Sequence, residues 1–153
     1  MSYWVQPARE AGDTDRIEPM RILIVDDHGP FAEALSLTLD AVDGFDVVGT
    51  AADADEAVRL ARKLFPDVVL MDIQMPGVDG IEATRRVRAA VPQAAVVAVS
   101  GGATAEQVER VHEAGAAAFF PKSGSVDELA GTIAVAAVRP RRPLRRRLLD
   151  AVT

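Results

Sequence analysis

Residues 21–27 read RILIVDD, and residues 67–72 read DVVLMD. Each stretch is a short run of branched or long apolar side chains that ends in aspartate. Runs of this length and composition are typical of strands buried in a parallel sheet. Three more apolar runs follow the same pattern, so we predict five strands, at residues 21–25, 45–51, 67–71, 94–99 and 116–120.

The segments between these runs have apolar residues three or four positions apart, which predicts helices at residues 30–41, 53–64, 80–90, 104–114 and 125–138. The helix ends carry the usual signals. Pro30 stands in a first turn, Asp53 and Ser125 are placed as N-caps, and Gly115 follows a helix end. Strands and helices that alternate five times predict an α/β fold, a doubly wound parallel sheet with helices on both faces.

The composition excludes several classes of protein. The chain has 153 residues, about one domain by length, and 49% of them are apolar. It has no Cys and two His, which excludes disulfide frameworks, thiol nucleophiles and zinc sites built on Cys. No apolar run is long enough to span a bilayer, and the N-terminus lacks the pattern of a signal peptide. We therefore expect a cytoplasmic protein without membrane contact.

Charge is distributed unevenly along the chain. Residues 21–138 carry 9 basic and 18 acidic side chains, whereas residues 139–153 carry six arginines and one aspartate. We predict a flexible extension at residues 1–19, one folded domain at 20–138, and a basic tail or the start of a linker at 139–153. Because an acidic domain repels DNA phosphates and the tail has no scaffold to aim it, we expect no specific DNA binding by this chain alone.

Polar side chains follow four of the predicted strands. Asp26 and Asp27 follow the first strand, Asp72 the third, Ser100 the fourth and Lys122 the fifth. Ligands of such sheets bind beyond the carboxyl ends of the strands. If the strand order is 2-1-3-4-5, the first and third strands are neighbours, and the three carboxylates meet beside a hydroxyl and an ammonium.

Carboxylates that converge in this way repel one another, so the site either raises a pKa or recruits a cation. Oxygen donors without His or thiolate favour Mg²⁺, which accepts one or two carboxylates together with a phosphoryl oxygen. A carboxylate can itself attack phosphorus and form an aspartyl phosphate. Asp72 is therefore the candidate nucleophile.

The strings ILIVDDHGPF at residues 22–31 and VVLMDIQMPGVDGIEATRRVRA at 68–89 resemble the receiver domain of bacterial two-component response regulators, the NarL/FixJ subfamily in particular. The resemblance covers residues 20–138 and implies a flavodoxin-like fold. It implies that Asp72 is the phosphoacceptor and that Asp26 and Asp27 are the acidic pair of a Mg²⁺ site. It also implies that the backbone carbonyl of Gln74 is a metal ligand.

The resemblance further assigns a switch. Ser100 matches the switch hydroxyl, Lys122 the family's lysine, and Phe119 the aromatic side chain that rotates. Phe119 lacks the hydroxyl of a tyrosine, so it can turn but cannot form a hydrogen bond at its tip. Many receivers have proline after the lysine, whereas here Ser123 follows and the geometry of that peptide is left open.

The function implied is regulatory rather than enzymatic. A sensor histidine kinase would phosphorylate Asp72, and the face formed by the fourth helix, the fifth strand and the fifth helix would change. Transcription would then be regulated through a DNA-binding domain that this chain does not contain. The fifth helix, with Val126, Leu129, Ile133 and Val138 besides many Ala, has more apolar surface than one core contact needs. The face that includes this helix is therefore the candidate surface of a homodimer.

Other functions fit the residues less well. A haloacid-dehalogenase-like phosphatase needs a second Asp two residues after the nucleophile, where this chain has Gln74. A flavodoxin-like electron carrier needs a Ser/Thr/Gly-rich loop after the first strand, and the Asp pair there would repel a cofactor phosphate. The alternative that stays open is a receiver used for docking or dimerisation without phosphorylation. His28 is expected to be a surface or capping residue rather than a ligand.

Overall fold

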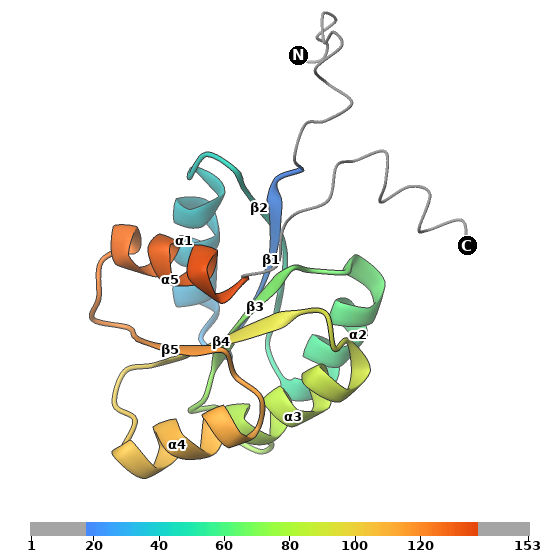
Figure 1. Ribbon diagram of the computed structural model, residues 1–153, viewed down its shortest axis with the longest axis vertical. Helices are drawn as coiled ribbons and strands as arrows, with labels where there is room; N and C mark the ends of the chain where they lie inside the picture. The colour runs from blue at the N-terminus through green and yellow to red at the C-terminus, as the bar shows by residue number, and fades with distance from the viewer. Residues whose placement is uncertain (1–17, 138–153) are drawn as a thin grey trace, which may run out of the picture. The chain divides into compact units, whose positions relative to one another are not determined.

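The computed structural model describes residues 18–137. Residues 1–17 of the predicted extension, the basic tail and Val138 lie outside the described residues. Within residues 18–137, five strands alternate with five helices (Figure 1). The strands are β1 (Met20–Val25), β2 (Phe45–Ala51), β3 (Val68–Asp72), β4 (Ala95–Ser100) and β5 (Ala118–Pro121). The helices are α1 (Gly29–Asp40), α2 (Ala54–Leu64), α3 (Gly80–Ala90), α4 (Ala105–Glu113) and α5 (Val126–Ala136).

The strands form a parallel sheet in the order β2-β1-β3-β4-β5, which confirms the predicted fold. Val25 is paired with Met71 in the neighbouring strand, so Asp26 and Asp72, one residue further along each strand, lie at the same edge. Ser100 is paired with Pro121, which brings Lys122 to that edge as well. The register of the sheet therefore gathers the predicted polar residues.

Helices cover both faces of the sheet (Figure 1). One buried core lies between the sheet and α2, α3 and α4, and the other lies between the sheet and α1 and α5. Leu129 and Ile133 are buried in the second core. These two side chains form the contact of α5 with the sheet, so a dimer surface on this helix would need its other apolar residues. Val135, at 74% exposure, is the large apolar side chain that α5 presents to solvent.

The sequence predicted most element boundaries to within one or two residues. The strands at 67–71, 94–99 and 116–120 begin one or two residues later than predicted. The last difference arises because Gly115, at φ +114°, and Ala116 still belong to the turn after α4. β2 was expected to be buried, yet six of its seven residues are partly or fully exposed, because β2 is an edge strand.

Several helix ends match their predicted caps. Asp53 and Ser125 cap α2 and α5, and each side chain accepts a hydrogen bond from the backbone N–H three residues on. His28 caps α1 through Nδ1, which accepts from the N–H of Phe31 at 3.2 Å. None of the helices in residues 18–137 combines the length and apolarity needed to cross a membrane.

Candidate functional site

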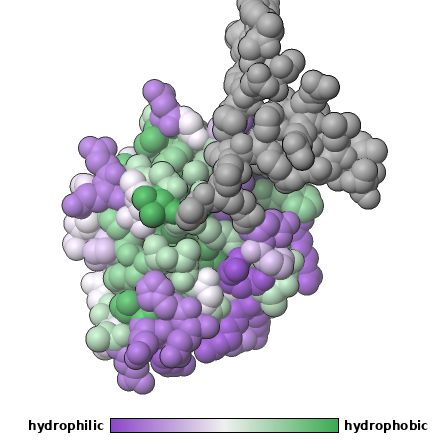
Figure 2. Space-filling model, viewed as in Figure 1, coloured by the Kyte–Doolittle hydropathy of each residue, from purple (hydrophilic) through white to green (hydrophobic). Residues whose placement is uncertain are grey.

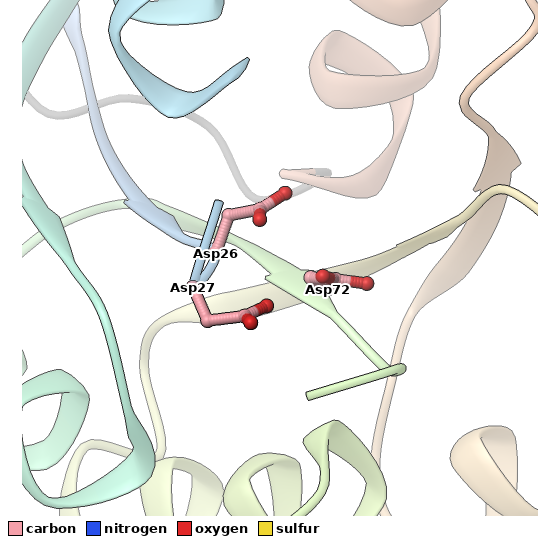
Figure 3. A group of neighbouring side chains, drawn as sticks. All are labelled: Asp26, Asp27 and Asp72. Atoms are coloured by element: carbon pink, nitrogen blue, oxygen red, sulfur yellow. The ribbon is translucent and has the colours of Figure 1, made fainter. Parts of the chain in front are cut away.

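Three carboxylates meet at the carboxyl edge of the sheet. Asp26 and Asp27 extend from the end of β1 toward Asp72 at the end of β3 (Figure 3). Each offers an oxygen within 4.8 Å of an oxygen of the other two. Asp26 and Asp72 are buried, at 4% and 5% exposure, and Asp27 is exposed. The predicted cluster therefore exists, with one carboxylate open to solvent.

Lys122 supplies a positive charge to this cluster. Its Nζ lies 2.9 Å from Oδ2 of Asp26 and 3.6 Å from Oδ2 of Asp72. The ammonium also lies 4.4 Å from the centre of the Phe31 ring. One ammonium faces three carboxylates, so negative charge remains in excess.

Backbone groups fix the two buried carboxylates. Oδ1 of Asp26 accepts from the N–H of His28 at 2.8 Å, and Oδ1 of Asp72 accepts from the N–H of Gln74 at 3.1 Å. Each carboxylate is thus anchored by one oxygen, while the other faces Lys122.

The environment of Asp72 disfavours its charged form. Burial raises the pKa of Asp72 above its ordinary value, and the negative charges of Asp26 and Asp27 raise this pKa further. The Gln74 N–H and the Lys122 ammonium lower it, but they do not cancel the increase. A bound cation would relieve this repulsion, and the all-oxygen donor set fits a hard divalent ion such as Mg²⁺.

Ser100 and Gln74 each form a hydrogen bond with Gly102, in the loop between β4 and α4. Ser100 is buried, and its Oγ accepts from the N–H of Gly102 at 3.1 Å. The side-chain Nε2 of Gln74 donates to the carbonyl of the same Gly102 at 3.2 Å. Gly102 is thus held from both sides. The sequence did not predict this contact of the Gln74 side chain.

The remaining predicted residues lie close by in the fold. Phe119 is partly buried and packs against the core under α2, α3 and α4. The Lys122–Ser123 peptide is trans, as are the other peptide bonds in the described part of the chain. The role of the Gln74 carbonyl as a ligand stays a prediction.

Gly80 is a residue whose importance the sequence did not reveal. A Cβ at this position would lie 2.2 Å from the carbonyl oxygen of Asp72 and 2.4 Å from Cα of Ile73. Only glycine lets the first turn of α3 press against the backbone of Asp72. The sequence showed Gly80 at the start of a helix, where many residue types are acceptable, so it gave no signal.

Phe31 is a second residue whose role the sequence did not indicate. It appears within the string ILIVDDHGPF but carries no group that titrates or binds metal. Its ring beside Lys122 becomes visible only when β1, α1 and β5 are assembled.

The family model of the response regulator receiver domain matches residues 22–134. The chain belongs to this receiver family. GacA of Pseudomonas viridiflava is 40% identical over 114 residues, which cover 74% of this chain and 53% of GacA. LiaR of Bacillus subtilis, a transcriptional regulatory protein, is 37% identical over 117 residues, which cover 76% of this chain and 56% of LiaR.

A solved structure agrees with this assignment. The signal receiver domain of the NarL response regulator from Mycobacterium tuberculosis superposes with a TM-score of 0.74 at 31% identity, covering 78% of this chain and 97% of that domain. The resemblance to NarL-like receivers is thereby confirmed. The receiver spans about half the length of the curated relatives it matches. A receiver domain is generally a regulatory module, and it implies a histidine kinase as partner.

Proposed function

We propose that Asp72 accepts a phosphoryl group from a phosphohistidine of a sensor histidine kinase. The observation that carries this proposal is a buried, anchored Asp72 carboxylate placed between two other carboxylates and an ammonium. In the reaction, an Asp72 oxygen forms a bond to phosphorus while the bond from phosphorus to the histidine nitrogen breaks. The bonding electrons stay on that nitrogen, and the imidazole is released.

Mg²⁺ is the cofactor that this site fits. Asp27 and Asp72 would hold it directly, Asp26 would act through water, and the backbone carbonyl of Gln74 would complete the protein ligands. When bound, the ion offsets the charge that gathers on the phosphoryl oxygens. Asp27 is the exposed carboxylate of the three, so a Mg²⁺ ion could reach the site from solvent on its side.

After transfer, the Lys122 ammonium and the Ser100 hydroxyl would bind the phosphoryl oxygens. A phosphoryl group brings up to two negative charges, and these ammonium and hydroxyl groups belong to the adjoining strand ends. Movement of Ser100 would end its contact with Gly102 and open space for Phe119 to turn inward. The surface formed by α4, β5 and α5 would then change shape.

The output of this switch is proposed to be transcription. LiaR is a transcriptional regulatory protein, and it extends well beyond the part that this receiver matches. A DNA-binding domain outside residues 20–138 would carry the output, and the basic residues 139–153 would lead toward it. The alternative, docking or dimerisation without phosphorylation, predicts the same fold and a silent Asp72.

A homodimer through the face that includes α5 is part of the proposal. In the view of Figure 2, hydrophilic side chains gather over the lower part, where α3 and α4 lie, and more hydrophobic surface lies above them. Val135 is 74% exposed, and its neighbour Ala134 is exposed as well. These residues are apolar surface that α5 keeps beyond the core contact of Leu129 and Ile133, and the proposed dimer contact uses them.

Phosphate uptake tests the proposal directly. Wild type, Asp72→Asn and the exposed-site control Asp127→Asn are incubated with Mg²⁺ and a small phosphodonor, and intact masses are compared. We expect one base-labile phosphoryl group on wild type and on the control, and none on Asp72→Asn. Equal uptake by Asp72→Asn refutes the assignment, and no uptake by wild type favours the docking alternative.

Beryllofluoride tests the switch separately. Amide shifts should appear around Ser100, Phe119 and the exposed face of α5. Shifts confined to α1 and α2 would contradict the proposed surface.

A further inference from the structure

We propose that Phe31 is a positioning residue that holds the Lys122 ammonium at the phosphorylation site through the face of its ring. The inference rests on the proposed function of Asp72. Its direct evidence is the distance of 4.4 Å from Nζ to the ring centre, together with the contacts of the same ammonium with Asp26 and Asp72. Phe31 contacts no reacting atom, so it would act through Lys122.

The ring is placed by the same short turn that places Asp26. The N–H of His28 donates to Asp26 at 2.8 Å, and Nδ1 of His28 accepts from the N–H of Phe31 at 3.2 Å. Carboxylate and ring are therefore tied to one residue between β1 and α1. Lys122 reaches this turn from the end of β5, on a flexible stem of four carbons. At this turn the ammonium contacts the Asp26 carboxylate and the Phe31 ring.

The two contacts act differently on the ammonium. Its hydrogen bond to Asp26 is directional and short, and it holds the charge at the acidic pair. An aromatic face attracts a cation through its quadrupole anywhere over that face within about 6 Å of the ring centre, and no single N–H has to point at one acceptor atom. When Asp72 becomes phosphorylated, the ammonium has to move from Asp26 toward the phosphoryl oxygens. The ring contact tolerates this movement, whereas the contact with Asp26 resists it.

The ring also limits where Lys122 can go. The Lys122 side chain is 24% exposed, so water competes for its charge. An apolar ring on one side of the ammonium makes withdrawal into solvent less favourable. Phe31 thus favours positions of Lys122 that serve Asp72.

The alternative role for Phe31 is packing alone, since it is partly buried at the start of α1. Fluorination separates the two roles, because it weakens the negative ring face and changes the shape little. Pentafluorophenylalanine is incorporated at position 31 and, as a matched control, at Phe45 in β2. Phe31→Leu provides a second variant that keeps an apolar side chain without a ring.

Three quantities are measured on each full-length protein: the rate of phosphorylation by acetyl phosphate at saturating Mg²⁺, the affinity for Mg²⁺, and the ring-current shift of the Lys122 Hε protons. We expect both changes at position 31 to slow phosphorylation about three- to tenfold, with Mg²⁺ affinity within about twofold of wild type. The Hε resonances should lie upfield in wild type and lose that shift in Phe31→Leu. The Phe45 control should match wild type in all three.

The outcomes separate this inference from the proposed function. If wild type takes up no phosphate, the proposed function fails, and the kinetic part of the inference fails with it. If wild type is phosphorylated and the pentafluoro protein reacts at the same rate, Phe31 only packs and the inference is wrong. A wild-type Lys122 without an upfield shift overturns it whether or not phosphate is taken up.

Discussion

At the amino ends of the strands, guanidinium groups donate to backbone carbonyls, whereas at the carboxyl ends three carboxylates share one ammonium. Arg21 donates to the carbonyl of Leu64 at 2.6 Å. Arg88 donates to the carbonyls of Pro92 and Ala94, the latter at 2.8 Å. At the other end, Asp26, Asp27 and Asp72 lie together, and Lys122 forms ion pairs with Asp26 and Asp72. Hydrogen bonds thus hold the loops at one edge of the sheet, while the opposite edge keeps unbalanced negative charge that a cation can offset.

The largest effect is expected where the carboxyl end is most tightly packed. Gly80→Ala should lower the free energy of unfolding by about 3 kcal/mol, because the new Cβ would meet the backbone of Asp72 rather than a movable side chain. Urea denaturation measures the loss. Gly131→Ala is the control, since a Cβ there meets nothing within 4 Å, and a gain of about 0.5 kcal/mol is expected. A loss below about 1 kcal/mol for Gly80→Ala would show that α3 can move away.

Exchanging a cation at each end tests the comparison itself. Arg88→Met should lower the free energy of unfolding by about 1.5 kcal/mol, because backbone carbonyls that accept from the charged guanidinium lose their donor. This loss should be the same with and without Mg²⁺. Lys122→Met should instead increase the rise in Tm that Mg²⁺ produces, because the ion no longer competes with an ammonium. Equal responses to Mg²⁺ in the two variants would remove the distinction between the ends.

Asp72→Asn should raise the free energy of unfolding at pH 7 in metal-free buffer. This increase is expected to be smaller than the decrease in Arg88→Met. Burial raises the pKa of Asp72 above 3.8, so the folded state keeps its proton to higher pH than the unfolded state does. Wild-type stability therefore falls as the pH rises from about 3.8 through the folded-state pKa. Asn does not ionise, so the gain should be full at neutral pH and vanish below pH 3.8. A gain independent of pH would contradict this cause.

The smallest effect is expected for His28→Ser. Serine is also a good N-cap, so the free energy of unfolding should change by less than about 0.5 kcal/mol. The affinity for Mg²⁺, followed by amide shifts, should stay within about twofold. A large fall in affinity would make His28 part of the charged site rather than a cap.

The sequence predicted the fold and the position of the charged residues because both follow from periodicity. Aspartates at the ends of apolar runs must meet if parallel strands are neighbours, and they do. Periodicity indicated that α5 has more apolar residues than one core contact needs, but not which of them the sheet covers: Leu129 and Ile133 are buried, whereas Val135 is exposed. It also gives no measure of distance between segments far apart in the chain, which is why the close approach at Gly80 and the ring of Phe31 were not foreseen.

The two hydrogen bonds on Gly102 determine how often the loop between β4 and α4 is released without a stimulus. One comes from the Gln74 side chain, and the other goes to the Ser100 hydroxyl. Neutral hydrogen bonds contribute about 1 kcal/mol each, so a loop held by two of them would be released in roughly 3% of molecules at any moment without a stimulus. If the proposed switch operates through this loop, these molecules would be its active population before phosphorylation, and their number would rise in proportion to the protein concentration.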